Sequence, residues 1–239
     1  MFINYAHRGA SHYAPENTMP SFDLGVTMGA TGIETDLQQT KDGQIVIFHD
    51  NTIDAKSNGT GAIADYTYEE LLTLDFGAWK DERFAGTKIV LFEDFAKKFL
   101  PLELTFAIEL KVTGIAEKAL KIMKEYGNMD NIYVSSFQFD ALQEAHDIDP
   151  NIKLTWLIKE PISEENIAKL KSIGGTQISP RATLVDEDQI ALAKANGLSV
   201  RLWGVADTDI MKKVYPLDTE GMTVNFPDEL KKLMESSPK

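Results

Sequence analysis

The stretch Gly32-Ile33-Glu34-Thr35-Asp36 places two carboxylates, two residues apart, on an apolar run that predicts a β-strand. A second apolar run, Thr105–Leu110, repeats the arrangement, with Glu109 on it and Lys111 directly after it. Residues two apart on a strand point to the same face. Because a carboxylate is costly to bury unless it is paired, the two runs predict that acidic groups gather at one place in a sheet.

Eight apolar runs of this kind alternate with amphipathic segments along the chain. They are nearly continuous in β-branched and aromatic residues, which is typical of strands buried in a parallel sheet. The runs are Phe2–Ala6, Gly32–Asp36, Thr105–Leu110, Asn131–Ser135, Lys153–Leu157, Thr176–Ile178, Leu198–Trp203 and Met222–Asn225. Between them, helix starts are indicated at Thr18, Ser163, Asp186, Asp207 and Pro227, and a helix end at Gly127. Eight βα units in 239 residues predict an α/β fold, a TIM-like (β/α)₈ barrel.

Residues 51–88 interrupt the alternation. They are polar, contain the run Ser57-Asn58-Gly59-Thr60-Gly61, and carry one short helical pattern near Tyr68–Leu74. We interpret them as a small insertion after the second strand, on the catalytic face. Because no repeat or linker is visible elsewhere, residues 1–239 are expected to form one barrel domain that contains this insertion.

The composition excludes several classes of function. Lys and Arg number 24 against 37 Asp and Glu, a net charge of −13, which argues against nucleic-acid binding and electrostatic docking on an anionic membrane. There is no cysteine, and therefore no disulfide or thiolate site. No apolar run is long enough to cross a bilayer, and residues 1–6 do not read as a signal peptide. We expect a cytoplasmic protein without stable membrane insertion; its oligomeric state stays open, a homo-oligomer included.

Active sites of (β/α)₈ barrels lie at the carboxyl ends of the strands. There the pattern gathers Glu34, Asp36 and Glu109, which would repel one another unless a cation lay between them. Ligation by oxygen alone favours Mg²⁺, Ca²⁺ or Mn²⁺ over Zn²⁺. The three carboxylates therefore predict a site for one divalent cation.

Cations and imidazoles accompany these acids. Arg8 and Lys111 suit contacts to phosphate oxygens, while His7 and His49 suit general base and acid catalysis. Each residue alone has an ordinary structural explanation, such as an ion pair between Glu109 and Lys111. Their convergence at strand ends predicts metal-assisted cleavage of a phosphate ester.

Several motifs resemble the glycerophosphodiester phosphodiesterase family, in its short, soluble bacterial type, over essentially the whole chain. The matching stretches are His7-Arg8-Gly9-Ala10, Ala14-Pro15-Glu16-Asn17-Thr18, Gly32–Leu37, Thr40-Lys41-Asp42-Gly43, Val46–Asp50, Glu109-Leu110-Lys111, Ser135-Ser136-Phe137 and Phe226-Pro227-Asp228.

The resemblance implies hydrolysis of small-molecule glycerophosphodiesters to glycerol 3-phosphate and an alcohol. It implies that the divalent cation is Mg²⁺ or Ca²⁺, with Mn²⁺ as an alternative. The site residues it implies are Glu34, Asp36 and Glu109 for the metal, His7 and His49 for catalysis, and Arg8 and Lys111 for the substrate.

Three stretches depart from the family pattern: Ala55-Lys56-Ser57, Trp203-Gly204-Val205-Ala206 and Val224-Asn225-Phe226-Pro227. None includes a candidate site residue, so they bear on the substrate rather than on the reaction. One alternative function is lysophospholipase D-like hydrolysis of lysolipids, in a groove lined by Phe137, Trp156 and Trp203. Another is a barrel that serves as a non-catalytic binding module.

Overall fold

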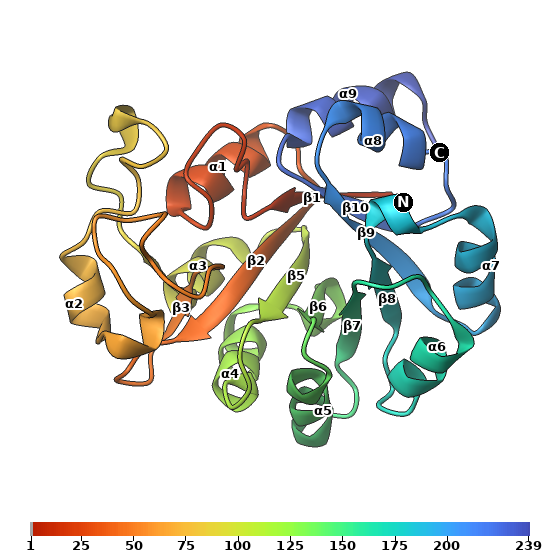
Figure 1. Cartoon of the computed structure of the whole chain (residues 1–239), viewed down its shortest axis with the longest axis horizontal. Coiled ribbons are helices and arrows are strands. Elements are labelled where there is room, and N and C mark those ends of the chain that lie inside the picture. The colour runs from red at the N-terminus through yellow and green to blue at the C-terminus, as the bar shows by residue number, and fades with distance from the viewer. Residues whose placement is uncertain (1) are drawn as a thin grey trace.

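A closed barrel of parallel strands forms the centre of the protein, in a computed structural model that describes residues 2–239 (Figure 1). The barrel strands are β1 Ile3–His7, β2 Gly32–Gln39, β5 Thr105–Leu110, β6 Ile132–Ser136, β7 Lys153–Ile158, β8 Gln177–Pro180, β9 Ser199–Val205 and β10 Gly221–Val224. The ring closes because β1 pairs in parallel with both β2 and β10. The predicted (β/α)₈ barrel is confirmed, and its strands begin and end within a few residues of the predicted runs.

Helices connect the strands and cover the outside of the barrel (Figure 1). They are α1 Met19–Thr27, α3 Phe92–Phe99, α4 Ala116–Tyr126, α5 Phe139–Ile148, α6 Glu164–Lys171, α7 Glu187–Ala195, α8 Thr208–Val214 and α9 Pro227–Ser236. Side chains of Ser163, Asp186 and Asp207 accept hydrogen bonds from the first turns of their helices, as N-caps do. The start of α3 was not predicted, since Leu91 at its N-cap has no capping side chain. Within residues 2–239, no helix is both long and apolar enough to span a membrane.

The predicted insertion lies within a short antiparallel extension of the barrel, between its two strands. Strand β3, Ile45–Ile47, pairs antiparallel with β2, and β4, Val90–Leu91, pairs antiparallel with β3. Residues 51–88 lie between them and contain α2, Tyr68–Leu72, at the left of Figure 1. The segment has its own small apolar cluster, which includes Ile53, Ile63 and Leu71.

The interior of the barrel is polar, whereas the space between strands and helices is apolar. Inside, Thr155 Oγ1 donates to Gln177 Oε1 at 2.9 Å, and Arg201 Nη1 donates to Thr223 Oγ1 at 2.8 Å. Outside the strands, the rings of Phe22, Phe95 and other buried aromatic residues pack together. The apolar layer holds the helices in place, and the polar interior leads up to the carboxyl ends of the strands.

Candidate active site

Three buried carboxylates meet at the carboxyl ends of β2 and β5. Asp36 and Glu109 are partners in the strand register, and Glu34 precedes Asp36 by two residues on the same face. One ligand oxygen from each of the three lies within 4.8 Å of the others. Their side chains are 6% (Glu34), 1% (Asp36) and 6% (Glu109) exposed. The structure therefore brings together the three acids that the sequence placed at strand ends.

Two cations partly neutralise this cluster, and an amide donates a hydrogen bond to it. Arg8 Nε lies 3.2 Å from Asp36 Oδ2, and Lys111 Nζ lies 2.9 Å from Glu109 Oε1. Asn17 Nδ2 donates to Asp36 Oδ2 at 2.8 Å. Burial opposes ionisation of Asp36, but the charges of Arg8, His49 and Lys111 hold its pKa down at about 2. This carboxylate is consequently charged across the physiological range.

The other two acids are under-neutralised. Burial, together with the negative charge of Asp36, raises the pKa of Glu109 to about 7 and raises that of Glu34 well above its ordinary value. Asp36 Oδ1 is buried and accepts no hydrogen bond. A divalent cation at this point would give that oxygen a partner and remove the repulsion between the carboxylates. The residues present thus fit a hard cation ligated by oxygen.

His7 is held in one orientation by the end of the barrel's last strand. Its Nδ1 lies 2.6 Å from Asn225 Oδ1, an oxygen that also accepts a hydrogen bond from Ser11 Oγ at 3.0 Å. Since that oxygen can only accept, Nδ1 carries the proton and Nε2 is left as an acceptor, 3.9 Å from Glu34 Oε2. Burial and the nearby Arg8 charge lower the pKa of His7 to about 3, so its imidazole is neutral.

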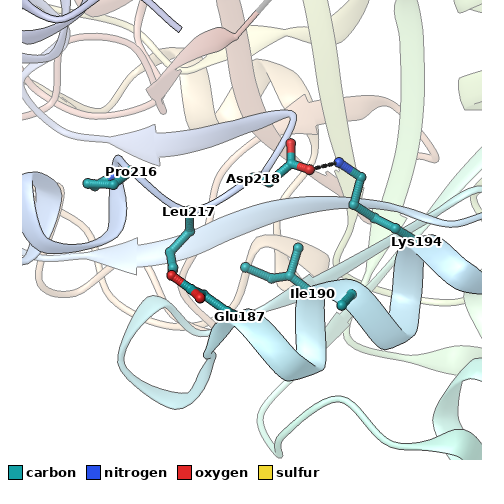
Figure 2. Close-up of a pocket in the computed structure, with 7 residues that line it drawn as sticks. Glu187, Ile190, Lys194, Pro216, Leu217 and Asp218 are labelled. Atoms are coloured by element: carbon teal, nitrogen blue, oxygen red, sulfur yellow. Dashed lines mark hydrogen bonds and ion pairs between the residues drawn. The ribbon is translucent and has the colours of Figure 1, made fainter.

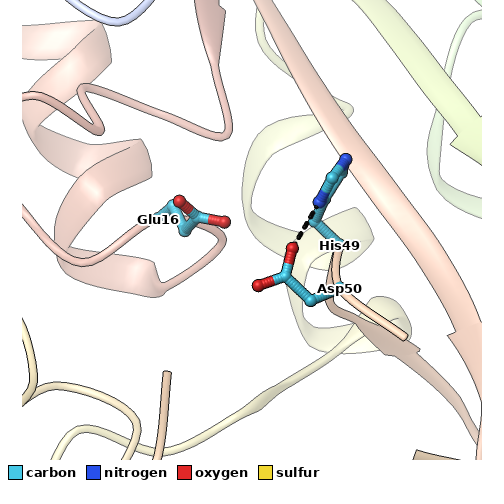
Figure 3. Close-up of side chains that lie close together, drawn as sticks. All are labelled: Glu16, His49 and Asp50. Carbon is cyan, nitrogen blue, oxygen red and sulfur yellow. Dashed lines mark hydrogen bonds and ion pairs between the residues drawn. The ribbon is translucent and has the colours of Figure 1, made fainter. Parts of the chain in front are cut away.

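His49, two residues after the end of β3, has a charged partner instead. Its Nδ1 lies 2.7 Å from Asp50 Oδ1, and the carboxylate of Glu16 faces this pair across a gap (Figure 3). Ligand atoms of Glu16, His49 and Asp50 lie within 4.8 Å of one another. However, Glu16 is already bound to Arg8 at 2.8 Å and to Lys56 at 3.3 Å. We interpret Glu16 as the connection that holds Arg8 in place, rather than as part of a second metal site.

The connection extends into the insertion. Lys56 Nζ lies 3.8 Å from the centroid of the Trp79 ring, as well as against Glu16. Lys80 follows Trp79 in the chain, and its Nζ donates to the backbone oxygen of Ser11 at 2.9 Å. Residues 51–88 therefore support the loop that follows β1 and carries Arg8.

A cavity of about 310 Å³ opens beside the carboxylates. Its lining residues are His7, Arg8, Glu34, His49, Glu109, Phe137, Leu157, Arg201, Trp203, Gly204 and Thr223. The rings of Phe137 and Trp203 meet edge to face, with centroids 5.0 Å apart, and form part of its apolar wall. Charged groups on one side and an apolar wall on the other are typical of a small-molecule site.

Trp156 is not part of that wall. The predicted groove of Phe137, Trp156 and Trp203 is therefore wrong for Trp156. Its ring packs against Phe139 at 5.1 Å and beneath Lys169, on the helix side of β7. The neighbouring Leu157 points into the cavity instead. Because side chains alternate along a strand, only one of these two neighbours can face the interior.

A second hollow, of about 250 Å³, lies between α7 and the segment that precedes β10 (Figure 2). An ion pair between Lys194 and Asp218 crosses it. This hollow is at the amino end of β10, the opposite end of the barrel from the carboxylates. Of the residues that line it, none is a histidine or belongs to an acidic cluster.

Comparison with known proteins identifies the fold and its chemistry. The profile of the glycerophosphoryl diester phosphodiesterase family matches residues 7–229. The chain belongs to this family. It is accordingly an enzyme that hydrolyses phosphodiesters, and not a non-catalytic binding module.

Relatives within the family match over nearly their whole length. A glycerophosphodiester phosphodiesterase from Caldanaerobacter subterraneus subsp. tengcongensis is 33% identical over 231 residues, which cover 94% of each chain. The crystal structure of the enzyme from Agrobacterium tumefaciens superposes with a TM-score of 0.87 at 26% identity, covering 97% of this chain and 100% of that one. An Oleispira antarctica phosphodiesterase, solved in complex with the product sn-glycerol-3-phosphate, superposes with a TM-score of 0.90 at 26% identity, covering 97% and 96%.

Sequence reasoning did not assign roles to four residues that shape the site. Glu16 and Asn17 lie in a stretch that matches the family, and Asp50 follows His49 directly, so the motifs did contain a signal for these three. Asn225 appeared only as part of a departure from the family pattern. Its contact with His7 spans 218 residues of sequence and is made only in the closed barrel.

Proposed function

We propose that this enzyme hydrolyses glycerophosphodiesters to glycerol 3-phosphate and an alcohol, with a divalent cation and two histidines. The observation that supports this most directly is the buried trio of acids, beside two imidazoles with different partners. Within the trio, Asp36 Oδ1 accepts no hydrogen bond from residues 2–239, and Lys111 Nζ lies 3.7 Å from it. The family assignment and the product bound to the Oleispira antarctica relative agree with it.

Glu34, Asp36 and Glu109 would hold the cation, for which we propose Mg²⁺ or Ca²⁺, with Mn²⁺ as an alternative. When bound, the cation supplies Lewis-acid stabilisation of the charge that develops on the phosphoryl group. Arg8 and Lys111, which lie against the same acids, would neutralise the remaining phosphate oxygens.

His7 is the proposed general base, because the contact of Nδ1 with Asn225 leaves Nε2 free to accept a proton. That proton comes from the attacking hydroxyl, which belongs either to a water molecule or to the 2-hydroxyl of the substrate's own glycerol. The second route first gives a cyclic glycerol phosphate, which a water molecule then opens to glycerol 3-phosphate. His49 is the proposed general acid, since the contact with Asp50 Oδ1 orients its ring beside the cavity. As the new P–O bond forms, the P–O bond to the alcohol breaks, and His49 gives its proton to the departing oxygen.

The test is release of glycerol 3-phosphate from glycerophosphocholine and glycerophosphoethanolamine by the purified protein. The protein is stripped with EDTA and then given Mg²⁺, Ca²⁺ or Mn²⁺ separately. We expect release only with a metal, its loss in Glu34→Ala, and a fall in kcat of about 10²- to 10⁴-fold in His7→Ala. His146→Ala, on α5 and away from the cavity, is the matched control. Metal-independent release, or full activity of His7→Ala, would contradict the proposal.

A lysophospholipase D-like activity is the second candidate, because Phe137, Leu157 and Trp203 give the cavity an apolar wall. Activity on long-chain lysophosphatidylcholine that exceeds activity on glycerophosphocholine would favour it. The opposite order would favour water-soluble diesters as substrates.

A further inference from the structure

Arg201 is a buried cation that the proposed chemistry does not use. It lies on β9, points into the barrel, and is 1% exposed. Its Nε donates to Gln177 Oε1 at 3.3 Å, its Nη1 donates to Thr223 Oγ1 at 2.8 Å, and the guanidinium lies over the ring of Tyr5, 5.3 Å from the centroid. In the part of the chain that the structure describes, it forms no ion pair with a carboxylate.

One nitrogen of this guanidinium is left over. Nη2 is buried and has no hydrogen-bond partner, and Arg201 is one of the residues that line the cavity beside the carboxylates. A buried cationic N–H without an acceptor is costly, and native proteins rarely leave one in place without a reason. A ligand atom in the cavity would supply the missing acceptor.

The position of Arg201 indicates which part of a substrate would reach it. Thr223, its partner, is level with Tyr5 in the register of β10 and β1, and β1 runs two residues further to His7. Two strand residues span about 6–7 Å, so Thr223 and Tyr5, which contact the guanidinium, belong to the layer of inward-facing side chains below His7. The phosphate belongs at the upper level, against Arg8 and Lys111, so Arg201 meets a group attached to the phosphate and not the phosphate itself.

The cavity floor suits a small, neutral acceptor. Leu157 is 4% exposed and Arg201 1%, so the floor is closed, and a leaving alcohol of variable size would have to point outwards. Glu34 lines the same cavity, and its carboxylate would repel a second anionic group there. The glycerol half of the substrate is small, is common to all these diesters, and ends in a hydroxyl a few bonds from the ester oxygen.

We propose that Arg201 is a specificity residue whose Nη2 donates a hydrogen bond to the terminal hydroxyl of the glycerol moiety. This inference rests on the proposed function and adds the reason why glycerol phosphates are preferred to phosphates of simpler diols. The hydrogen bond to Thr223 holds the guanidinium at the level in the barrel where Nη2 can reach that hydroxyl.

The experiment measures binding by calorimetry, with the divalent cation present, so that it does not depend on turnover. The probes are sn-glycerol 3-phosphate, propane-1,2-diol 1-phosphate, which lacks the terminal hydroxyl, and inorganic phosphate. Wild type is compared with Arg201→Met and Arg201→Lys, and with Arg83→Met as the matched removal of an exposed arginine from the insertion. Melting temperatures identify variants that fail to fold. Arg201→Lys keeps the buried charge and serves as the test if Arg201→Met does not fold.

We expect wild type and Arg83→Met to bind glycerol 3-phosphate about 10- to 100-fold more tightly than the diol phosphate, the range of a charged hydrogen bond. Arg201→Met should abolish this difference and Arg201→Lys should reduce it, with the diol phosphate and inorganic phosphate bound as before. Equal weakening of all three probes, or no discrimination by wild type, would overturn the inference. Suppose wild type cleaves glycerophosphocholine but binds glycerol 3-phosphate no more tightly than the diol phosphate: the inference about Arg201 then fails and the proposed function stands. If the difference in binding depends on Arg201 but no diester is cleaved, only the proposed function fails.

Discussion

Asn225 Oδ1 lies 2.6 Å from Nδ1 of His7, so the last strand of the barrel fixes the ring at the end of the first. Because the amide oxygen can only accept, it selects the tautomer in which Nε2 is free and faces the carboxylates. The other imidazole, His49, has the carboxylate of Asp50 in the same position, 2.7 Å away. The two rings therefore have different partners, a neutral amide on His7 and a carboxylate on His49.

The Asn225 contact predicts the behaviour of Asn225→Leu. This variant keeps the branched shape of the side chain but removes the acceptor, so His7 loses its preferred tautomer. We expect kcat to fall about 10- to 100-fold with a smaller change in KM. Steady-state kinetics on glycerophosphocholine measure both, and an unchanged kcat would contradict the role of Asn225.

The Asp50 contact predicts non-additive effects. Asp50→Asn should lower kcat because it alters the contact that orients the His49 ring. His49→Ala should lower it by about 10²- to 10⁴-fold, and the double variant should be no slower than His49→Ala, since Asp50 acts only through that ring. If the two losses multiply instead, Asp50 has a separate role.

The crowding of the acids predicts opposite effects of Glu109→Gln on activity and stability. The substitution removes a metal ligand, so metal-dependent activity should be lost. It also removes a buried like charge, so the metal-free protein should unfold with a free energy higher by roughly 1–3 kcal/mol. Thermal denaturation in EDTA measures this; Glu93→Gln on α3, an exposed glutamate, is the control. A lower melting temperature for Glu109→Gln would contradict the repulsion.

The raised pKa values of Glu34 and Glu109 predict a pH dependence of metal binding. A carboxyl whose pKa is raised in the folded state stabilises the fold below its unfolded pKa, about 4.5, and that stabilisation is lost as the pH rises through the folded pKa, about 7 for Glu109. The metal-free protein should therefore lose stability between pH 5 and 8. The metal, which competes with those protons, should raise the melting temperature more at pH 8 than at pH 5.5. Thermal scans with and without the ion at both pH values are the test.

The turn after β1 predicts the effect of a single methyl group. Gly9 has φ +81°, and a Cβ there would come within 2.4 Å of backbone and side-chain atoms of Ser21. Gly86 has a similar φ of +84° but open space around it. Gly86→Ala should cost about 1–2 kcal/mol, the strain of the left-handed conformation alone. Gly9→Ala should cost more and should also lower activity, because it displaces the neighbouring Arg8. Equal melting temperatures for the two variants would contradict this.

The alternation of strands and helices could be predicted from the sequence, because it depends on local patterns. Continuous apolar runs identify buried parallel strands, and capping residues mark helix starts within a residue or two. Glu34 and Asp36 had to share a face because the side-chain period of a strand is two. Glu109 joins them because β2 pairs with β5, a contact between distant segments that follows from the barrel fold and not from the local pattern.

How distant residues complete the site depends on the tertiary structure. Asn225 reaches His7 because the ring closes between β10 and β1, and Glu16 joins Arg8 to Lys56 because the insertion folds back on the first loop. Which side chains of β7 face the cavity depended on register. Leu157 faces it and Trp156 does not, since successive side chains of a strand point to opposite faces. Closure, register and the filling of the barrel are properties of all eight strands together, and no local pattern contains them.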